Sequence, residues 1–318
     1  MSERVDFYAR QARNRRWTWV LIFTFIVLVT AVGAAADLFL LGSYRPGAGG
    51  FPIVSALALG FASLQSLNAY FNGDRAVLGA VHARPLQPMA NREERELLNI
   101  VTEMSLASGL TPPKVYVIDD PAPNAFATGR DPDHASIGVT RGLLDVLDRE
   151  QTQGVIAHEM AHIRNYDIRT MTLVAVLFGV VVLISDWSIR GLRYGGGRSR
   201  GSRRGGGGIL AILALVFIIL APIVSRLVAM AVSRQREYLA DASGAEFTRN
   251  PAGLARALEE IRTHHSAMKS ATRGTAHLFI HDPLERKLDD KEGAWANLWS
   301  THPPVEERIR RLRAMAYT

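Results

Sequence analysis

Apolar residues in this chain are gathered into a few long blocks rather than spread evenly. The first block, 17–41, carries no charge before Asp37, and the second, 51–71, carries none at all. Each is long enough to cross the hydrocarbon core of a bilayer, which takes about 20 residues of helix. The pattern predicts two transmembrane helices. The first block is too long, and the second too close behind it, for a cleavable signal peptide.

Two more apolar blocks, 171–184 and 209–232, follow later in the chain. The second of these is long enough to span a membrane, whereas the first reaches that length only if its polar ends are counted. A pair of helices buried inside a globular domain fits the same pattern, so the number of crossings stays open. The glycine- and arginine-rich stretch between them, 190–208, is predicted to be a connecting loop.

The other segments have the polarity of ordinary globular structure. A basic N-terminal segment, 1–16, precedes the first span, and by the positive-inside rule its arginines place the N-terminus in the cytoplasm. Two spans then return the chain to the same side. We therefore expect residues 72–170 and 233–318, the front and back parts of one domain, to be cytoplasmic. If both later apolar blocks within 171–232 also cross, the arginine-rich loop lies outside, against the same rule.

One five-residue segment, His158-Glu159-Met160-Ala161-His162, carries the clearest chemical signal. On a helix, residues i and i+4 lie one turn apart on one face, so both imidazoles can reach one metal ion. Neutral imidazole suits Zn²⁺, and a catalytic zinc site keeps one position open for water. A nearby carboxylate can take the proton of that water as it attacks a polarised carbonyl. The segment predicts a zinc hydrolase with Glu159 as base; two satisfied interior histidines are the alternative.

The flanking residues predict the helix that this motif needs. Asp148 can serve as N-cap, with Gln151 three residues later completing a capping box. Val155, Ile156 and Ile163 then form part of an apolar stripe that would be buried.

A second segment supplies carboxylates at helical spacing. Glu237 and Asp241 are i and i+4 on a predicted helix. One carboxylate could bind zinc while the other, a turn away, orients a ligand histidine. A solvated charged face at a helix end is the alternative interpretation.

The order of these motifs, H-E-x-x-H followed at a distance by E-x-x-x-D, is the gluzincin pattern. The chain resembles the HtpX-type membrane metallopeptidases, which are related to the CaaX prenyl proteases. Four separate segments carry the resemblance, in the family's order: 124–129, 158–167, 236–241 and 301–309.

The resemblance implies a mainly α-helical membrane protein, with transmembrane helices and a gluzincin-like zinc protease domain that contains a small β element. It assigns three ligands to one Zn²⁺ per chain: His158, His162 and Glu237. Glu159 would be the general base, and Asp241 would support a ligand histidine. His302 is the candidate that stabilises the tetrahedral oxyanion.

Two strands are predicted in the front part of the domain. The alternating run 114–118 predicts the first, and 124–129 is a candidate for the second, although a simple turn there fits nearly as well. The resemblance makes the second an edge strand that pairs with the substrate backbone. The substrate-binding residues would then be Asn124, Ala125, Phe126 and Ala127.

The back part of the domain is predicted to be helical, with helical spacing over 255–263 and 304–314. The second of these helices carries a dense arginine stripe, which we interpret as a solvated or headgroup-facing surface.

Charge and cysteine content narrow the possible partners. The net charge of +7 is explained by arginine-rich segments beside membrane spans, so we expect no nucleic-acid partner. The chain has no cysteine, which excludes disulfides and thiolate ligands. One alternative is an RNA-binding membrane protein that uses the loop 190–208, which is similar to RGG segments. Another is a site-two-type intramembrane protease, disfavoured by the charged Arg149 and Glu150 beside the motif.

The favoured interpretation is a membrane-bound zinc metalloendopeptidase that hydrolyses peptide bonds in membrane or misfolded proteins. Analogy with the family alone supplies a role in protein quality control and stress response. It also implies a multi-pass protein of a bacterial inner membrane, with the catalytic domain in the cytoplasm.

Overall fold

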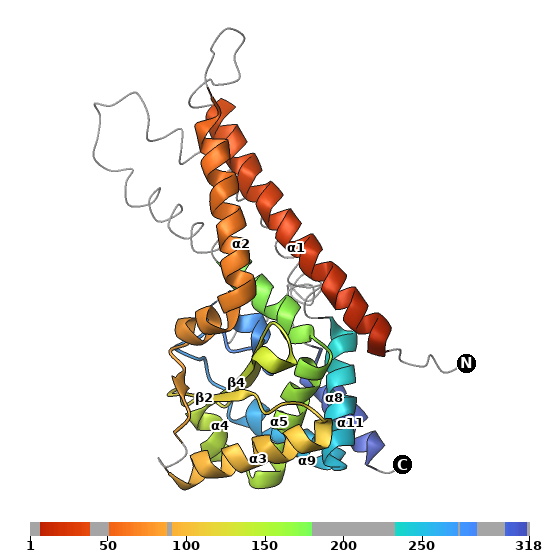
Figure 1. Cartoon of the computed structure of the whole chain (residues 1–318). Helices are drawn as coiled ribbons and strands as arrows, with labels where there is room; N and C mark the ends of the chain where they lie inside the picture. Colours follow the sequence, from red (N-terminus) through yellow and green to blue (C-terminus); the bar gives the residue numbers. More distant parts are fainter. Residues whose placement is uncertain are drawn as a thin grey trace, which may run out of the picture.

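The structure is a computed structural model, and it describes residues 7–38, 51–87, 91–179, 233–272, 274–284 and 303–316. The chain is mainly helical, with one small sheet (Figure 1). Two long helices, α1 (Phe7–Ala36) and α2 (Ile53–Ala80), lie side by side and project from the part that holds the sheet. The mainly α-helical fold with a small β element that the sequence predicts is confirmed.

Both long helices have the length and composition of membrane spans. The candidate spans cover 23 residues of α1, from Asn14 to Ala36, and the 28 residues of α2. Their outer faces carry large apolar side chains, among them Trp19 at 67% exposed and Leu64 at 69%. A patch of this extent is unusual on a water-soluble surface and is natural beside lipid. The helical φ/ψ values of α2 break at Asn72, where its apolar section ends.

The third apolar block begins against these two helices. The chain is helical over 167–179, and Leu177 and Phe178 there are buried in a cluster with residues of α1 and α2. The rings of Phe25 and Phe178 meet edge to face at 6.2 Å. Residues 180–232 lie outside the described residues. They comprise the remainder of this block, the arginine-rich loop and the fourth apolar block.

The sheet has four strands in the order β1-β2-β4-β3. Their bounds are β1 Arg84–Pro85, β2 Lys114–Ile118, β3 Ala125–Gly129 and β4 Ala135–Thr140. β2 and β4 run parallel, and the β1–β2 and β3–β4 pairs are antiparallel. β2 and β3 are the two predicted strands, and β3 lies at an edge.

The inner strand β4 was missed in the sequence because its middle residue is Gly138, which weakens a strand signal. The structure shows why glycine stands there. A Cβ at this position would lie 2.5 Å from the ring of Phe126 on the neighbouring strand.

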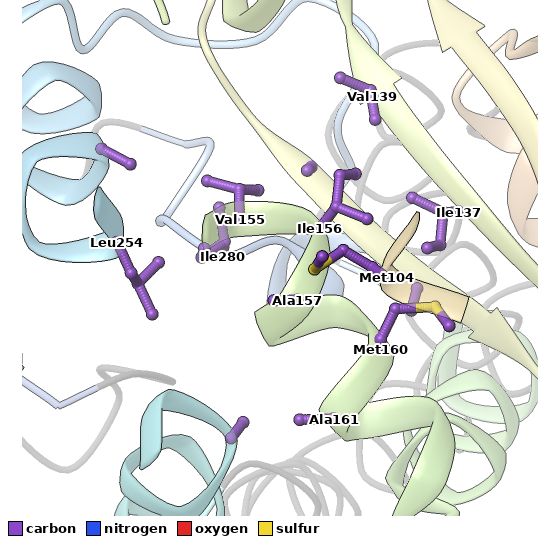
Figure 2. Packing of buried hydrophobic residues seen from close by; sticks show 14 of the residues in the cluster. Met104, Ile137, Val139, Val155, Ile156, Ala157, Met160, Ala161, Leu254 and Ile280 are labelled. Atoms are coloured by element: carbon purple, nitrogen blue, oxygen red, sulfur yellow. The ribbon is translucent and has the colours of Figure 1, made fainter. Parts of the chain in front are cut away.

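Besides α1, α2 and the stretch 167–179, the described residues form six α-helices: α3 (Arg92–Ser108), α4 (Arg141–Val146), α5 (Arg149–Arg164), α8 (Arg234–Thr248), α9 (Pro251–Thr263) and α11 (Val305–Met315). The predicted helices of the back part correspond to α9 and α11. α5 is central, in contact with α3, α8, α9 and β3. Figure 2 shows Ile156 and Met160 of α5 beside Ile137 and Val139 of β4, with Leu254 of α9 on the other side.

Glycines let the neighbouring helices approach α5 closely. A Cβ on Gly154 of α5 would lie 2.7 Å from the backbone nitrogen of Leu254 on α9. A Cβ on Gly244 of α8 would lie 3.0 Å from the backbone nitrogen of His158. The separation of α5 and α9 therefore admits hydrogen but not a methyl group at Gly154, and the contact with α8 at Gly244 is tighter than an ordinary side-chain contact.

A buried charge joins three elements beneath this core. Glu94 of α3 is fully buried and accepts hydrogen bonds from Arg84 Nη2 of β1 at 2.6 Å and Arg141 Nη2 of α4 at 3.0 Å. Its own backbone N–H donates to the N-cap side chain of Asn91 at 2.8 Å. The hydrogen bond from Arg84 outweighs desolvation and lowers the pKa of Glu94 below its usual value.

We expect Gly154→Ala to lower the free energy of unfolding by about 1–3 kcal/mol, because the added methyl forces α9 away from α5. Helix propensity alone predicts the opposite sign, a gain of about 1 kcal/mol. Gly79→Ala on α2 is the matched control, since a Cβ there meets nothing within 4 Å. Thermal unfolding of the detergent-purified protein, followed by circular dichroism, distinguishes the expected loss of stability from the gain that helix propensity predicts. Equal stability of Gly154→Ala and the native chain would contradict the close approach.

Replacing Glu94 by glutamine should destabilise the protein by about 1.5–3 kcal/mol at neutral pH, through loss of charge-assisted hydrogen bonds. Because the folded-state pKa is lowered, this stabilisation is present above the unfolded pKa and is lost as pH falls through the folded value. Urea unfolding at a series of pH values should show the native chain and Glu94→Gln converging in acid. A difference that is independent of pH would show that Glu94 acts by packing alone.

Candidate metal centre

The candidate zinc helix forms as the sequence predicts. The Asp148 side chain accepts a hydrogen bond from the Gln151 N–H at 2.8 Å, and the Gln151 side chain accepts one from the Asp148 N–H at 2.9 Å. This capping box satisfies two amide groups at the start of α5. Every residue from Gly154 to Ile163 is buried, so His158, Glu159 and His162 enter the protein interior rather than a solvated face.

Three potential ligands meet between α5 and α8. The ligand atoms of His158, His162 and Glu237 all lie within 4.8 Å of one another. The two histidine Nε2 atoms are 3.2 Å apart, and Glu237 Oε1 lies 3.5 Å from the Nε2 of His162. Glu237 Oε2 lies 3.8 Å from the Nε2 of His158. The side chains come from helices about 75 residues apart in the chain, brought together by the contact at Gly244.

A carboxylate stands behind each imidazole. Asp241 Oδ1 lies 3.0 Å from His158 Nδ1, and Asp167 Oδ2 lies 3.2 Å from His162 Nδ1. Each carboxylate favours the tautomer in which Nδ1 carries the hydrogen, and that tautomer leaves the Nε2 lone pair directed at the centre of the cluster. Asp241 therefore occupies the supporting position expected for it, and Asp167 supplies the matching support that the sequence interpretation did not assign.

The spacing of the three donors fits zinc. Two donor atoms at about 2.1 Å from a tetrahedral ion are about 3.4 Å apart. The two Nε2 atoms, 3.2 Å apart, are close to that value, and the two oxygens of Glu237 lie 3.5 Å from His162 Nε2 and 3.8 Å from His158 Nε2 respectively. Two imidazoles and one carboxylate, with no thiolate, form the ligand class of catalytic rather than structural zinc sites.

The electrostatics of the cluster favour a positive charge between the rings. Burial lowers the pKa of His158 to about 4. Burial also opposes a charge on His162, but the hydrogen bond with Asp167 and the proximity of Glu237 outweigh it and raise the pKa of His162 to about 9. Carboxylates thus surround two buried imidazoles, and a cation at the centre of the cluster would compensate their negative charge.

Glu159 lies near the edge strand, where the backbone N–H of Ala127 on β3 is close enough to its carboxylate to lower its pKa slightly. Burial raises the pKa of Glu159 to about 7, and the neighbouring charge of His162 opposes part of that rise. A carboxyl group with a pKa near neutrality can both accept and return a proton.

One important residue, Arg308, was assigned no role from the sequence. The arginine stripe of α11 was interpreted as a solvated surface, and this is wrong for Arg308, which is 1% exposed. Its Nε and Nη2 donate to both oxygens of Asp241, at 2.9 and 2.7 Å, and its Nη1 lies 3.6 Å from Glu237. The signal was available: Arg308 shares a helical face with the buried Leu312, at spacing i and i+4.

A second unassigned residue comes from the first membrane helix. Asn14 of α1 is 3% exposed, and its Nδ2 donates to Asp167 Oδ1 and to the Asn165 carbonyl, both at 2.9 Å. Since Asp167 supports His162, the base of α1 is connected to the candidate metal centre by two consecutive hydrogen bonds. The sequence gives no signal for this role, because Asn14 lies within the basic N-terminal segment.

The expected substrate-binding strand is partly covered on its outer edge. The carbonyl of Ala125 accepts a hydrogen bond from Ile280 N–H at 2.9 Å, and Asn124 exchanges side-chain hydrogen bonds with the backbone of His281. Phe126 is fully buried against Phe279. Ala127 is the residue of this group whose backbone N–H lies near Glu159. The structure therefore places the strand beside Glu159, with Ile280 lying along its outer edge.

The remaining expected site residue, His302, lies outside the described residues, as does the arginine-rich loop of the RNA-binding alternative. The described chain resumes at Pro303, five residues before Arg308.

Comparisons with known proteins show the family of the chain. The model of peptidase family M48 matches residues 91–316. A protein named Protease HtpX homolog from Thermoanaerobacter pseudethanolicus is 43% identical over 315 residues, covering 98% of this chain and 99% of that protein. A second of the same name, from Streptococcus uberis, is 41% identical over 311 residues, covering 97% and 99%.

A solved structure is also similar, the crystal structure of S. mikatae Ste24p, with a TM-score of 0.48 and 18% identity. The match covers 92% of this chain and 62% of that one.

The match to a peptidase family favours the enzyme over an RNA-binding membrane protein, and the resemblance to HtpX-type metallopeptidases is confirmed. Both the family match and the near full-length relatives include the two helices that carry the His-His-Glu cluster. The chain belongs to peptidase family M48.

Proposed function

We propose that this membrane-bound metallopeptidase is a zinc endopeptidase whose single Zn²⁺ is held by His158, His162 and Glu237. The observation that carries the proposal is the convergence of these three buried side chains, whose ligand atoms lie within 4.8 Å of one another, with a carboxylate behind each imidazole. The bound ion would polarise the scissile carbonyl and activate water.

The side chains around the proposed metal site have separate roles in the reaction. Glu159 takes the proton from the attacking water and returns it to the leaving amine, a general base and then a general acid. Its carboxylate lies near the backbone N–H of Ala127, on the strand that the substrate would follow. His302 donates to the developing oxyanion. Arg308 touches no reacting atom in this scheme and instead holds Asp241 against His158.

Substrates are membrane or misfolded proteins whose backbone pairs with the outer edge of β3. Backbone pairing reads little of the side-chain sequence, which suits a quality-control and stress-response enzyme. In the conformation described, the Ala125 carbonyl already accepts a hydrogen bond from the Ile280 N–H. A substrate that pairs along the whole of β3 therefore requires the segment around Ile280 to move aside. Nucleic acid has no part in the proposed activity.

The enzyme resides in a bacterial inner membrane with its catalytic domain in the cytoplasm. The arginines before α1 support this orientation through the positive-inside rule. The hydrogen bonds of Asn14 are consistent with it, because the base of α1 lies on the same side as the metal centre.

The base and the ligands should be separable by mutation. Glu159→Gln should keep zinc and lose at least about 100-fold in turnover, since a positioned base contributes about 10²–10⁴-fold. His158→Ala and Glu237→Ala remove a ligand and should lose zinc as well as activity. Elemental analysis and casein cleavage by detergent-purified protein measure both quantities.

The control for this series is Glu150→Gln, an exposed carboxylate on the same helix. It should retain zinc and turnover. Full zinc content in Glu237→Ala would contradict the third-ligand assignment, and undiminished cleavage by Glu159→Gln would contradict the mechanism.

Arg308→Lys should weaken zinc binding by about 10- to 100-fold, because lysine keeps the charge but cannot hold both oxygens of Asp241 behind His158. Competition with a chromogenic chelator gives the zinc affinity. Arg310→Lys, on the exposed face of α11, should leave the affinity unchanged. If Arg308→Lys binds zinc as tightly as the native chain, the arginine has only a structural role.

The orientation of the catalytic domain can be tested with single cysteines, since the chain has none of its own. A cysteine at the exposed Ala107 should react with an impermeant maleimide only after the cells are permeabilised. A cysteine at Ser43, between the two spans, should react in intact cells. Labelling of Ala107→Cys from outside would overturn the cytoplasmic site.

A further inference from the structure

A cavity of about 300 Å³ opens where α2 meets the sheet, on a part of the domain that the metal centre does not use. Its lining comes from the end of the apolar section of α2, residues 69–75, and from the β3–β4 connection and its flanks, 129–136. Lys114, Arg169, Thr172 and Leu173 complete it.

The position of the cavity relative to the membrane follows from α2. The exposed apolar side chains Leu64, Leu67 and Phe71 end immediately before the break at Asn72, and Arg75 follows within one turn. A span whose apolar face stops at residue 71 puts the next residues at the level of the lipid headgroups. The cavity therefore opens at the boundary between hydrocarbon and water.

The lining is rich in cations. Arg75, Lys114, Arg130 and Arg169 all contribute, against two carboxylates, those of Asp74 and Asp133. The side chains of Arg75 and Lys114 are exposed and have no ion pair within the described ranges. Two positive groups left uncompensated at one opening attract an anion.

The other two arginines are fixed in place. Arg130 donates from Nη1 to the Phe71 carbonyl at 3.3 Å and stacks over the Phe71 ring at 5.5 Å, and its Nε lies 3.4 Å from the carboxylate of Asp131, which compensates its charge. Arg169 donates from Nε to the carbonyl of Arg130 and lies 5.8 Å from the ring of Tyr70. Arginines held in this way are preorganised donors, so an incoming anion orders little side-chain freedom.

A buried hydroxyl gives independent support. Ser136 of β4 lines the cavity, is 1% exposed, and its Oγ has no hydrogen-bond partner among the residues described. It lies opposite Lys114 in the β2–β4 register. A buried unpaired hydroxyl is costly, and a ligand oxygen would satisfy it.

We propose that this cavity binds the phosphate group of an anionic phospholipid. Arginine and lysine recognise phosphate oxygens, and basic pockets beside membrane helices accept lipid headgroups. Free inorganic phosphate shares this chemistry, but the opening at headgroup level beside Leu67 and Phe71 favours the lipid. The proposal does not depend on the zinc assignment.

The test uses the detergent-purified full chain and its thermal unfolding midpoint. Phosphatidylglycerol, phosphatidylcholine and inorganic phosphate are titrated separately. Phosphatidylglycerol should raise the midpoint saturably, and the other two should do so much less. In the double variant Arg75→Gln/Lys114→Gln, the phosphatidylglycerol concentration that gives half of the rise in midpoint should increase about thirtyfold, because two cations at the level of the headgroups are lost. Arg92→Gln/Arg95→Gln, which removes two exposed arginines of α3 outside the cavity, should respond like the native chain.

A second variant, Ser136→Ala, tests the buried hydroxyl. Without lipid its midpoint should equal or exceed that of the native chain, because the hydroxyl it removes has no partner in the part of the chain described. In the titration with phosphatidylglycerol, Ser136→Ala should need a lipid concentration several times higher than the native chain for the same rise in midpoint. If both the cavity variants respond to phosphatidylglycerol as the native chain does, the proposal is overturned. An equal response to inorganic phosphate, lost in Arg75→Gln/Lys114→Gln, would overturn the lipid as ligand in favour of free phosphate.

Discussion

Two imidazoles and four carboxylates are buried together in the interior of the catalytic domain, the carboxylates being those of Glu159, Asp167, Glu237 and Asp241. Their negative charge needs a compensating positive charge, and the organisation of the domain follows from that need. The rings of His158 and His162 are each backed by an aspartate, and Glu237 closes the third side. Such a cluster is unstable as a set of isolated charges. Arg308 lies near the C-terminal end of the chain, is buried, and supplies one positive charge by pairing with Asp241. The arrangement of the ligand atoms is suited to a second positive charge, that of a metal ion.

Local patterns in the sequence were sufficient for the parts of the site that lie on one helix. The capping box at Asp148 and the spacing of His158 and His162 depend on residues within a few positions of one another, and both could be predicted. The strand 114–118 was also predictable, because it alternates and ends at a turn. Arg308 could not be given its role in the same way, because its contact with Asp241 depends on the packing of α11 beside α8. Asp167 lies only five residues after His162, but its contact depends on the turn at 165–166 that ends α5, which the helical pattern does not predict.

The sheet illustrates the same limit. β3 was predicted as a strand, but its neighbour β4 contains a glycine that only the packing of Phe126 explains. The interpretation of α11 failed for a different reason. An arginine-rich helix usually faces solvent, and here Arg310 and Arg311 do so while Arg308, on the apolar face, does not. The composition of α11 therefore predicted its exposed arginines correctly and misplaced the buried Arg308.

The contact between Asn14 and the loop after α5 has a consequence for how α1 sits in a bilayer. An isolated spanning helix adapts to a thinner or thicker membrane by changing its tilt. The lower end of α1 is held by hydrogen bonds to Asn165 and Asp167, and its upper part packs against α2 and Phe178. The tilt of α1 is therefore set by the protein, so a mismatch in thickness must be taken up by the surrounding lipid.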